Sequence, residues 1–238
     1  MKKAIVLLLA AVICTGLTAC NTGNTEISQE TVSQTETVVE EDTSDTNDTI
    51  TNDSESKILI AYFSLPENAD TSGVDAVAGA SIVLNNEKVL GNTEYMAYAI
   101  QEAVGGDLFR IETVQQYPLE HEPLVEMADE EQNGNARPEL LNRVENMEQY
   151  DTIFLGYPNW WGDMPMPLYT FLEEYDLSGK TIIPFSSHGG SGFSRTESTI
   201  AQMQPNASVS ENGLTVSRND VADSYEDVFQ WAENIIAE

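Results

Sequence analysis

Short apolar runs mark the buried strands of this chain. Three of them begin at Lys57, Thr152 and Thr181, and the last two pass into loops rich in glycine or tryptophan. A continuous apolar run is typical of a parallel strand that helices cover on both faces. Residues 107–113 alternate between polar and apolar side chains, which favours an edge strand, and residues 214–217 supply a fifth strand.

Helical periodicity lies between these strands. Residues 93–104 carry apolar side chains at helical spacing and end at Gly105-Gly106, which is a typical helix stop. The other predicted helices cover residues 123–132, 138–148, 166–175 and 194–203, and a last helix is capped by Asn219 or Asp220. The alternation of strand and helix predicts an α/β fold, with a doubly wound, five-stranded parallel sheet and helices on both faces.

The first residues predict export and a lipid anchor. Two lysines precede an apolar stretch, Ala4 to Ile13, that is too short to remain in a membrane as a span. The quartet Leu17-Thr18-Ala19-Cys20 then resembles the lipobox of bacterial lipoproteins. This resemblance implies a signal peptide over residues 1–20, lipidation of Cys20 and an extracytoplasmic protein anchored to the bacterial cell membrane. An ordinary secretory signal is the alternative.

Residues 21–56 predict a tether between the anchor and a folded domain. They hold ten acidic side chains and no basic one, and Ser, Thr and Asn fill most other positions. Such a segment buries too little apolar surface to offset its ordering entropy. We therefore expect a disordered acidic tether that carries one domain, residues 57–238.

Charge and cysteine content limit the chemistry of that domain. Of the chain's 10 basic and 40 acidic side chains, two and ten precede residue 57, which leaves 8 against 30 and a net charge of −22. Nucleic acid is not an expected partner, because binding to a phosphate backbone needs clustered Lys and Arg. Both cysteines, Cys14 and Cys20, lie in the signal region, so redox chemistry in the domain needs a bound cofactor. No metal-binding motif is present, and we assign no metal site.

Five short motifs stand at the predicted strand ends and helix starts. They are IAYFS at 60–64, GNT at 91–93, GYPNWWG at 156–162, GK at 179–180 and PFSSHGGSG at 184–192. Together they resemble the flavodoxin family, most closely its extracytoplasmic lipoprotein branch. The resemblance covers residues 57–238 and implies strand order 2-1-3-4-5, with FMN bound beyond the carboxyl ends of the strands.

For the FMN phosphate, the resemblance assigns amide and hydroxyl donors at a helix start. Ser64, Gly91, Asn92 and Thr93 would take this role, and such neutral donors suffice at a helix N-terminus. The chain departs from the family here, because an insertion of residues 65–90 follows the first strand, where an ordinary flavodoxin has almost none. Within it, residues 81–90 predict a hairpin about an Asn-Asn turn.

For the flavin ring, the resemblance assigns the loops after the third and fourth strands. An indole of the first loop would stack on the ring, while the second loop would bind its pyrimidine end through amides and hydroxyls. The assigned residues are Pro158, Asn159, Trp160, Trp161 and Gly162 in the first loop, and Ser186, Ser187, His188, Gly189, Gly190 and Ser191 in the second. His188 is also a candidate proton donor, although simple packing or loop roles stay open for it and for both tryptophans. His121 is expected to be structural or exposed.

These assignments predict a membrane-tethered FMN protein that transfers electrons to a redox partner protein or a small-molecule acceptor. An FMN-dependent reductase of a small molecule such as a quinone is one alternative, and a flavin-free binding lipoprotein on the same scaffold is another. An esterase fits less well. Ser191 has Gly189 two residues before it, but Phe193 stands where a nucleophile elbow needs the second glycine.

Overall fold

A parallel sheet forms the centre of the protein in the computed structural model, which describes residues 57–65, 82–85, 88–118 and 120–237. Its strands are β1 (Ile58–Tyr62), β4 (Asp107–Arg110), β5 (Thr152–Pro158), β6 (Thr181–His188), β7 (Ser208–Val209) and β8 (Leu214–Ser217). They lie in the order β4-β1-β5-β6, and β7 and β8 both pair with β6. The predicted strand order is confirmed, except that two short strands share the fifth position. The predicted signal peptide, Cys20, the tether and residues 66–81 lie outside the described residues.

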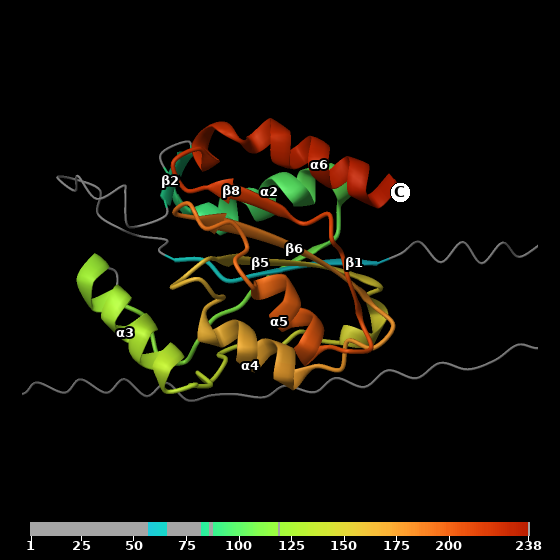
Figure 1. Cartoon of the computed structure of the whole chain (residues 1–238). Coiled ribbons are helices and arrows are strands. Elements are labelled where there is room, and N and C mark those ends of the chain that lie inside the picture. The colour runs from blue at the N-terminus through green and yellow to red at the C-terminus, as the bar shows by residue number, and fades with distance from the viewer. Residues whose placement is uncertain (1–56, 66–81, 86–87, 119, 238) are drawn as a thin grey trace, which may run out of the picture. The chain divides into compact units, whose positions relative to one another are not determined.

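Helices cover both faces of the sheet (Figure 1). One face carries α2 (Asn92–Val104) and α6 (Tyr225–Ala237), and the other carries α4 (Met166–Glu174) and α5 (Thr196–Met203). The remaining helix, α3 (His121–Asn133), projects at the end of the sheet where β1 finishes. The doubly wound α/β architecture is therefore confirmed.

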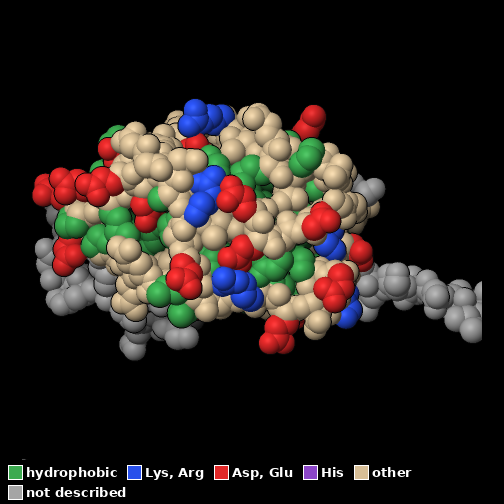
Figure 2. Space-filling view, turned by 90° about the horizontal axis from the view of Figure 1, so that it is seen from below, with side chains coloured by type: hydrophobic (Ala, Val, Ile, Leu, Met, Phe, Trp, Pro, Cys, Tyr) green, Lys and Arg blue, Asp and Glu red, His purple; other side chains and the backbone are tan. Residues whose placement is uncertain are grey.

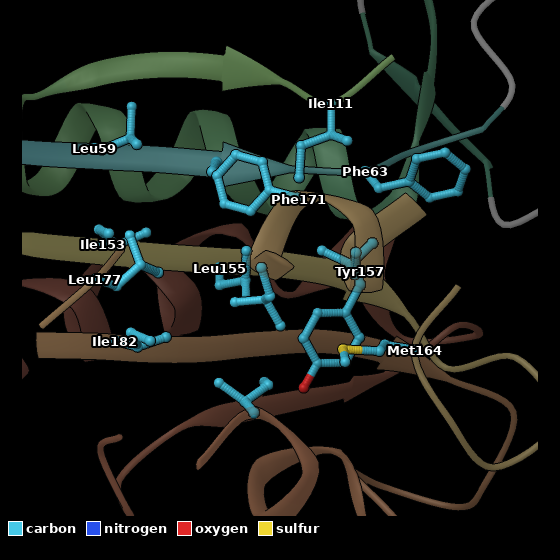
Figure 3. Packing of buried hydrophobic residues seen from close by; sticks show 14 of the residues in the cluster. Leu59, Phe63, Ile111, Ile153, Leu155, Tyr157, Met164, Phe171, Leu177 and Ile182 are labelled. Atoms are coloured by element: carbon cyan, nitrogen blue, oxygen red, sulfur yellow. The ribbon is translucent and has the colours of Figure 1, made fainter. Parts of the chain in front are cut away.

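Side chains of the strands alternate between two hydrophobic cores. On β1, Leu59 and Ala61 belong to the core beneath α4 and α5, whereas Ile58 and Ile60 belong to the core beneath α2 and α6. Leu59, Ile153 and Ile182 pair across three neighbouring strands and lie side by side (Figure 3). Burial on both faces explains why these strands read as continuous apolar runs.

Residues 138–148 do not form the predicted helix. Leu140 instead makes an antiparallel bridge with Thr113, and only Met147–Gln149 form a 3-10 turn, η1. The side chain of Asn142 accepts a hydrogen bond from the backbone of Glu112 and donates one to the carbonyl of Arg110. Bonding to the backbone beyond the edge strand therefore outweighs the helical spacing of the apolar residues.

The predicted hairpin is present and leads directly into a helix. Strand β2 (Ile82–Asn85) pairs antiparallel with β3 (Lys88–Gly91), and α2 begins at the next residue. Asn85 pairs with Lys88, so it belongs to the strand and not to the turn; residues 86–87 lie outside the described residues. At the other end of the domain, α6 begins at Tyr225 after a 3-10 turn, η2 (Val221–Asp223), so the helix starts later than the predicted caps.

The face over α4 and α5 carries isolated basic side chains beside acidic ones (Figure 2). Its ion pairs join Arg137 with Glu173, Arg143 with Glu174 and Arg195 with Asp163. The visible part of this face that the structure describes therefore offers no continuous basic surface of the kind that nucleic acid needs. Within the described ranges, every helix is too short or too polar to cross a membrane.

Candidate functional site

A pocket of about 260 Å³ opens where β5 and β6 end and α3 begins. Strand ends and loops contribute Pro158, Asn159, Trp160, Trp161, Ser187, His188, Gly189 and Arg218, and α3 contributes His121, Leu124, Val125 and Ala128. The carboxyl edge is where open α/β sheets bind their ligands. Because small-molecule pockets span about 300–1,000 Å³, this one suits a planar ring system better than a whole nucleotide.

A tight turn holds the two tryptophans of the pocket. Trp160 and Asp163 exchange two backbone hydrogen bonds, with N–O distances of 2.8 and 2.9 Å. Between them, Trp161 and Gly162 have φ angles of +54° and +77°. Two positive φ angles are the mark of a type I′ turn, which favours Asn and Gly, so the bulky Trp161 lies in an unfavourable left-handed conformation. Strain of this kind is concentrated at functional sites.

The two indoles lie in different surroundings. Trp160 is half-buried and packs edge-on against Phe63 and Tyr117, with ring centroids 5.6 and 5.7 Å away. Trp161 is 58% exposed, and its Nε1 donates a hydrogen bond of 3.3 Å to the carbonyl of Val125 on α3. Trp161 therefore presents the more accessible indole for a stacked ligand, whereas Trp160 also stabilises the core.

Asn159 fixes the first loop to the second. Its backbone N–H donates to the carbonyl of Ser187 at 2.8 Å, and its Nδ2 donates to the carbonyl of Gly192 at 2.8 Å. Its Oδ1 accepts a hydrogen bond from the backbone of Gly162 at 3.1 Å. Gly162 lies in the turn beside the pocket, and Asn159 holds that turn in position.

The second loop places only some of its predicted residues in the pocket. Ser187 lines it, and the buried Oγ of Ser187 finds no hydrogen-bond partner among the described residues. Ser186 is buried within β6 and does not line the pocket, since neighbouring residues of a strand point to opposite faces. Gly190 and Ser191 are exposed beyond it.

His188 has one ring nitrogen engaged and one available. Its Nδ1 accepts a hydrogen bond of 2.8 Å from the backbone N–H of Gly190. A nitrogen that accepts carries no hydrogen, so the neutral imidazole has its hydrogen on Nε2. His188 can therefore donate that hydrogen to a ligand in the pocket.

The predicted phosphate-binding residues come together despite the insertion. Ser64 Oγ accepts a hydrogen bond of 3.2 Å from the backbone N–H of Glu94, in the first turn of α2. A Cβ on Gly91 would lie 2.0 Å from that Oγ, so only glycine fits there. Asn92 and Thr93 are buried, and Asn92 Oδ1 has no partner among the described residues. The four residues form a separate group at the start of α2 and do not line the pocket described above.

A basic residue lies close to this group. Arg110 Nη2 donates a hydrogen bond of 2.8 Å to the carbonyl of Ser64, and Nη1 lies 3.8 Å from the carboxylate of Glu94. Burial lowers the pKa of Arg110, and burial followed by the charge of Glu94 raises the pKa of Tyr62. The motifs of the sequence did not indicate Arg110, because it lies on another strand, β4.

Sequence reasoning also missed the wall of the pocket that α3 provides. His121, Leu124, Val125 and Ala128 follow one another at helical spacing, so they share one face of the helix. That stripe was visible in the sequence, but a stripe does not show which edge of the sheet the helix packs against. Arg218 gave only one signal, its position directly after the last strand. Among the described residues, no three His, Asp, Glu or Cys side chains form a metal-binding group.

Comparison with known proteins gives the family. The family model for flavodoxin matches residues 81–235, and no curated protein matches the chain. The chain is similar to the structure of a presumed flavoprotein from Bacteroides eggerthii, with 27% identity and a TM-score of 0.56 over 77% of this chain and 99% of that one. A presumed flavoprotein from Bacteroides uniformis has 25% identity and a TM-score of 0.51, with 72% and 98% of the two chains covered.

A flavoprotein from Lactobacillus acidophilus, solved in complex with FMN, shares the fold. It has 19% identity and a TM-score of 0.50, with 72% of this chain and 99% of that chain covered. The match of the family model extends over more than half of the 238 residues. This protein therefore belongs to the flavodoxin family.

Proposed function

We propose that this protein binds FMN and transfers electrons through it, as a membrane-tethered protein outside the cytoplasm. The observation that carries the proposal is the pocket at the ends of β5 and β6. There an accessible indole, Trp161, accompanies buried polar atoms of Ser187 and Arg218 that lack partners among the described residues. Buried polar atoms in proteins are nearly always hydrogen-bonded, so these atoms favour a polar ligand.

The residues fit the chemistry of a flavin nucleotide. Trp161 offers an aromatic face to the ring, and Ser187 Oγ and His188 Nε2 offer polar contacts at its edge. At the start of α2, the backbone N–H groups of the helix N-terminus favour the phosphate. Bound FMN would supply the electron chemistry, while Trp161 and α3 orient the ring and exclude water, and Asn159 keeps the two loops in register.

An absorbance spectrum tests FMN binding directly. The purified full-length chain is measured before and after addition of FMN and desalting. We expect a flavin spectrum at about one FMN per chain. A colourless protein that also fails to retain added FMN contradicts the proposal and favours the flavin-free binding lipoprotein.

The site of attachment is tested through the two cysteines. The resemblance of residues 17–20 to a lipobox and the acidic composition of residues 21–56 support anchoring at Cys20. In a bacterial host, Cys20→Ser should release the protein from the membrane fraction. Cys14→Ser is the matched control and should leave it there. Equal membrane retention of both variants contradicts the anchor.

A reductase of a small molecule is the second candidate. The stripe of Leu124, Val125 and Ala128 on α3 favours it, because an apolar wall beside the flavin would hold a substrate such as a quinone. The two functions differ in turnover. A reductase turns over many equivalents of quinone per flavin, and its rate saturates as the quinone concentration rises. A carrier passes electrons to a partner protein, and its rate of oxidation does not saturate with quinone.

A further inference from the structure

Arg218 brings a guanidinium group into the wall of the pocket. It directly follows β8, its backbone N–H donates to the carbonyl of His188 at 2.8 Å, and its carbonyl accepts from Asn92 Nδ2 at 3.4 Å. The guanidinium lies against the second loop, where a Cβ on Gly189 would be 3.6 Å from Arg218 Cζ. The backbone on both sides is thus fixed, and the charged group is positioned before any ligand binds.

Among the described residues, no carboxylate forms an ion pair with Arg218. Its Nε is buried without a hydrogen-bond partner, and none of the described residues that line the pocket is Asp or Glu. The other arginines of the domain are all paired: Arg110, Arg137, Arg143 and Arg195 each lie within 4.0 Å of a carboxylate. An arginine without a carboxylate is unexpected in a domain whose net charge is −22, and it suggests an anionic ligand.

We propose that Arg218 stabilises the negative charge that a reduced flavin ring acquires. This inference rests on the proposed FMN function. Two electrons and one proton convert the oxidised ring, which is neutral, into a reduced ring with one negative charge at its pyrimidine end. The electrons come from a low-potential donor, which is dithionite in the test below. The second loop is the predicted contact of that end, and Arg218 lies against this loop.

Arg218 and the acidic surface have opposite effects on a negative charge in the pocket, and distance determines which effect is larger. Exposed charges more than about 8–10 Å away are largely screened at physiological salt. A cation in the pocket wall acts at short range and in a medium less polar than water, where charges interact more strongly. Arg218 should therefore determine the charge preference of the ring site, although the domain as a whole is acidic.

The same guanidinium would also suit the FMN phosphate, since Asn92 at the start of α2 contacts the backbone of Arg218. The two anions are distinguished by comparing FMN with riboflavin, which lacks the phosphate. A residue that binds the ring affects both ligands equally. A residue that binds the phosphate affects FMN alone.

The experiment measures potentials and affinities of the full-length chain. Wild type, Arg218→Gln and Arg218→Lys are titrated with dithionite under anaerobic conditions, and their affinities for oxidised FMN and riboflavin are measured by fluorescence. Arg143→Gln is the matched control, because it removes a positive charge from an exposed ion pair with Glu174. Circular dichroism and thermal melting establish that each variant is folded.

We expect Arg218→Gln to weaken binding of reduced FMN at least ten-fold more than binding of oxidised FMN. A ten-fold difference lowers the two-electron midpoint potential by about 30 mV. Arg218→Lys should restore part of the shift, and Arg143→Gln should cause none. The loss of oxidised-ligand affinity should be equal for FMN and riboflavin.

Other results overturn the inference. An unchanged midpoint potential in Arg218→Gln contradicts it while leaving the proposed FMN function intact. A loss of affinity for FMN but not for riboflavin assigns Arg218 to the phosphate instead. A wild-type chain that retains no FMN contradicts the proposed function itself, and the inference with it.

Discussion

The backbone conformation of Trp161 lowers the stability of the fold, whereas its position places an indole beside the pocket. A left-handed backbone costs a residue with a side chain roughly 1–2 kcal/mol, and Trp161 has a φ of +54°. Its indole is 58% exposed, so burial does not offset that cost. A tryptophan in this position is best explained by what the indole contacts when a ligand is bound.

Trp161→Asn should separate stability from ligand binding. Asn-Gly is a preferred pair for a type I′ turn, so we expect the free energy of unfolding in urea to rise by about 1 kcal/mol. Affinity for FMN should fall roughly two- to ten-fold, because the stacking contribution of about 0.5–1.5 kcal/mol is lost. Leu141→Asn, at a residue that is 62% exposed and outside the pocket, is the control. A variant that loses stability would show that the indole is structural.

The contact between Ser64 and Gly91 gives a second prediction at this scale. Gly91→Ala places a Cβ 2.0 Å from Ser64 Oγ, so we expect the free energy of unfolding to fall by about 1–3 kcal/mol. In a double-mutant cycle, Ser64→Ala should recover part of this loss, because it removes the oxygen that clashes. Additive effects of the two substitutions would contradict the contact.

Individual site residues were predictable only where a motif and the strand alternation agreed. Trp160, Trp161 and Ser187 were assigned from the loops at the strand ends, and they line the pocket. Ser186 belongs to the same motif, yet it lies inside β6, because one position along a strand changes the face. Arg218 lacked any motif, since its role follows from the pairing of β8 with β6.

At the scale of elements, a polar contact near the end of α3 helps to position this helix. Tyr117 donates a hydrogen bond of 2.7 Å to the carboxylate of Glu131, and Tyr117 also packs against Trp160. This contact ties the helix to the aromatic side chains beneath the pocket. Burial raises the pKa of Glu131 more than the hydrogen bond from Tyr117 lowers it.

The raised pKa of Glu131 predicts how stability depends on pH. The folded protein holds this proton more tightly than the unfolded chain, so protonation stabilises the fold. The contribution is complete below the ordinary value of 4.5 and is lost as the pH rises through the raised pKa. The free energy of unfolding of wild type minus that of Glu131→Gln should therefore increase as the pH falls from 7 towards 4.5.

The expected change is less than about 1 kcal/mol, because Glu131 is partly exposed and solvent screens it. Urea denaturation of both proteins at several pH values measures it, and Glu130→Gln is the matched control for removing a charge from α3. A difference that stays constant or decreases towards pH 4.5 would show that the pKa of Glu131 is not raised in the folded protein.

Elements were predicted best where both faces are buried. The strands that begin near residues 57, 152 and 181 and the helix that follows Gly91 were all expected from the sequence. Residues 138–148 carry similar helical spacing but form irregular structure, because Asn142 bonds to the end of β4 and Leu140 pairs with Thr113. Local spacing cannot indicate such a distant partner.

At the scale of the whole molecule, charge should control the encounter with redox partners. The domain carries a net charge of −22, so it attracts cations and repels anions until salt screens the field. Oxidation of the reduced flavoprotein by a cationic cobalt(III) complex should slow roughly ten-fold or more between low and high salt. Oxidation by ferricyanide, an anion, should accelerate.

Stopped-flow absorbance at several salt concentrations measures both rates, with the same reduced protein in each series. Opposite slopes support a reaction at an edge that experiences the acidic field of the whole domain. A ferricyanide rate that falls with salt would mean that the positive charge of Arg218 dominates at the point of contact.

The contact of Ser64 with Gly91 also matters for how such a scaffold acquires new parts. Ser64, just after β1, contacts Gly91 and Glu94 at the start of α2. The segment that joins β1 to α2 therefore begins and ends at neighbouring points of the fold. The entropy of closing a loop grows only with the logarithm of its length, so a change in the number of residues between β1 and β2 should have little thermodynamic cost. Members of the family can thus differ in the length of this connection, while the start of α2 beside it keeps the same conformation.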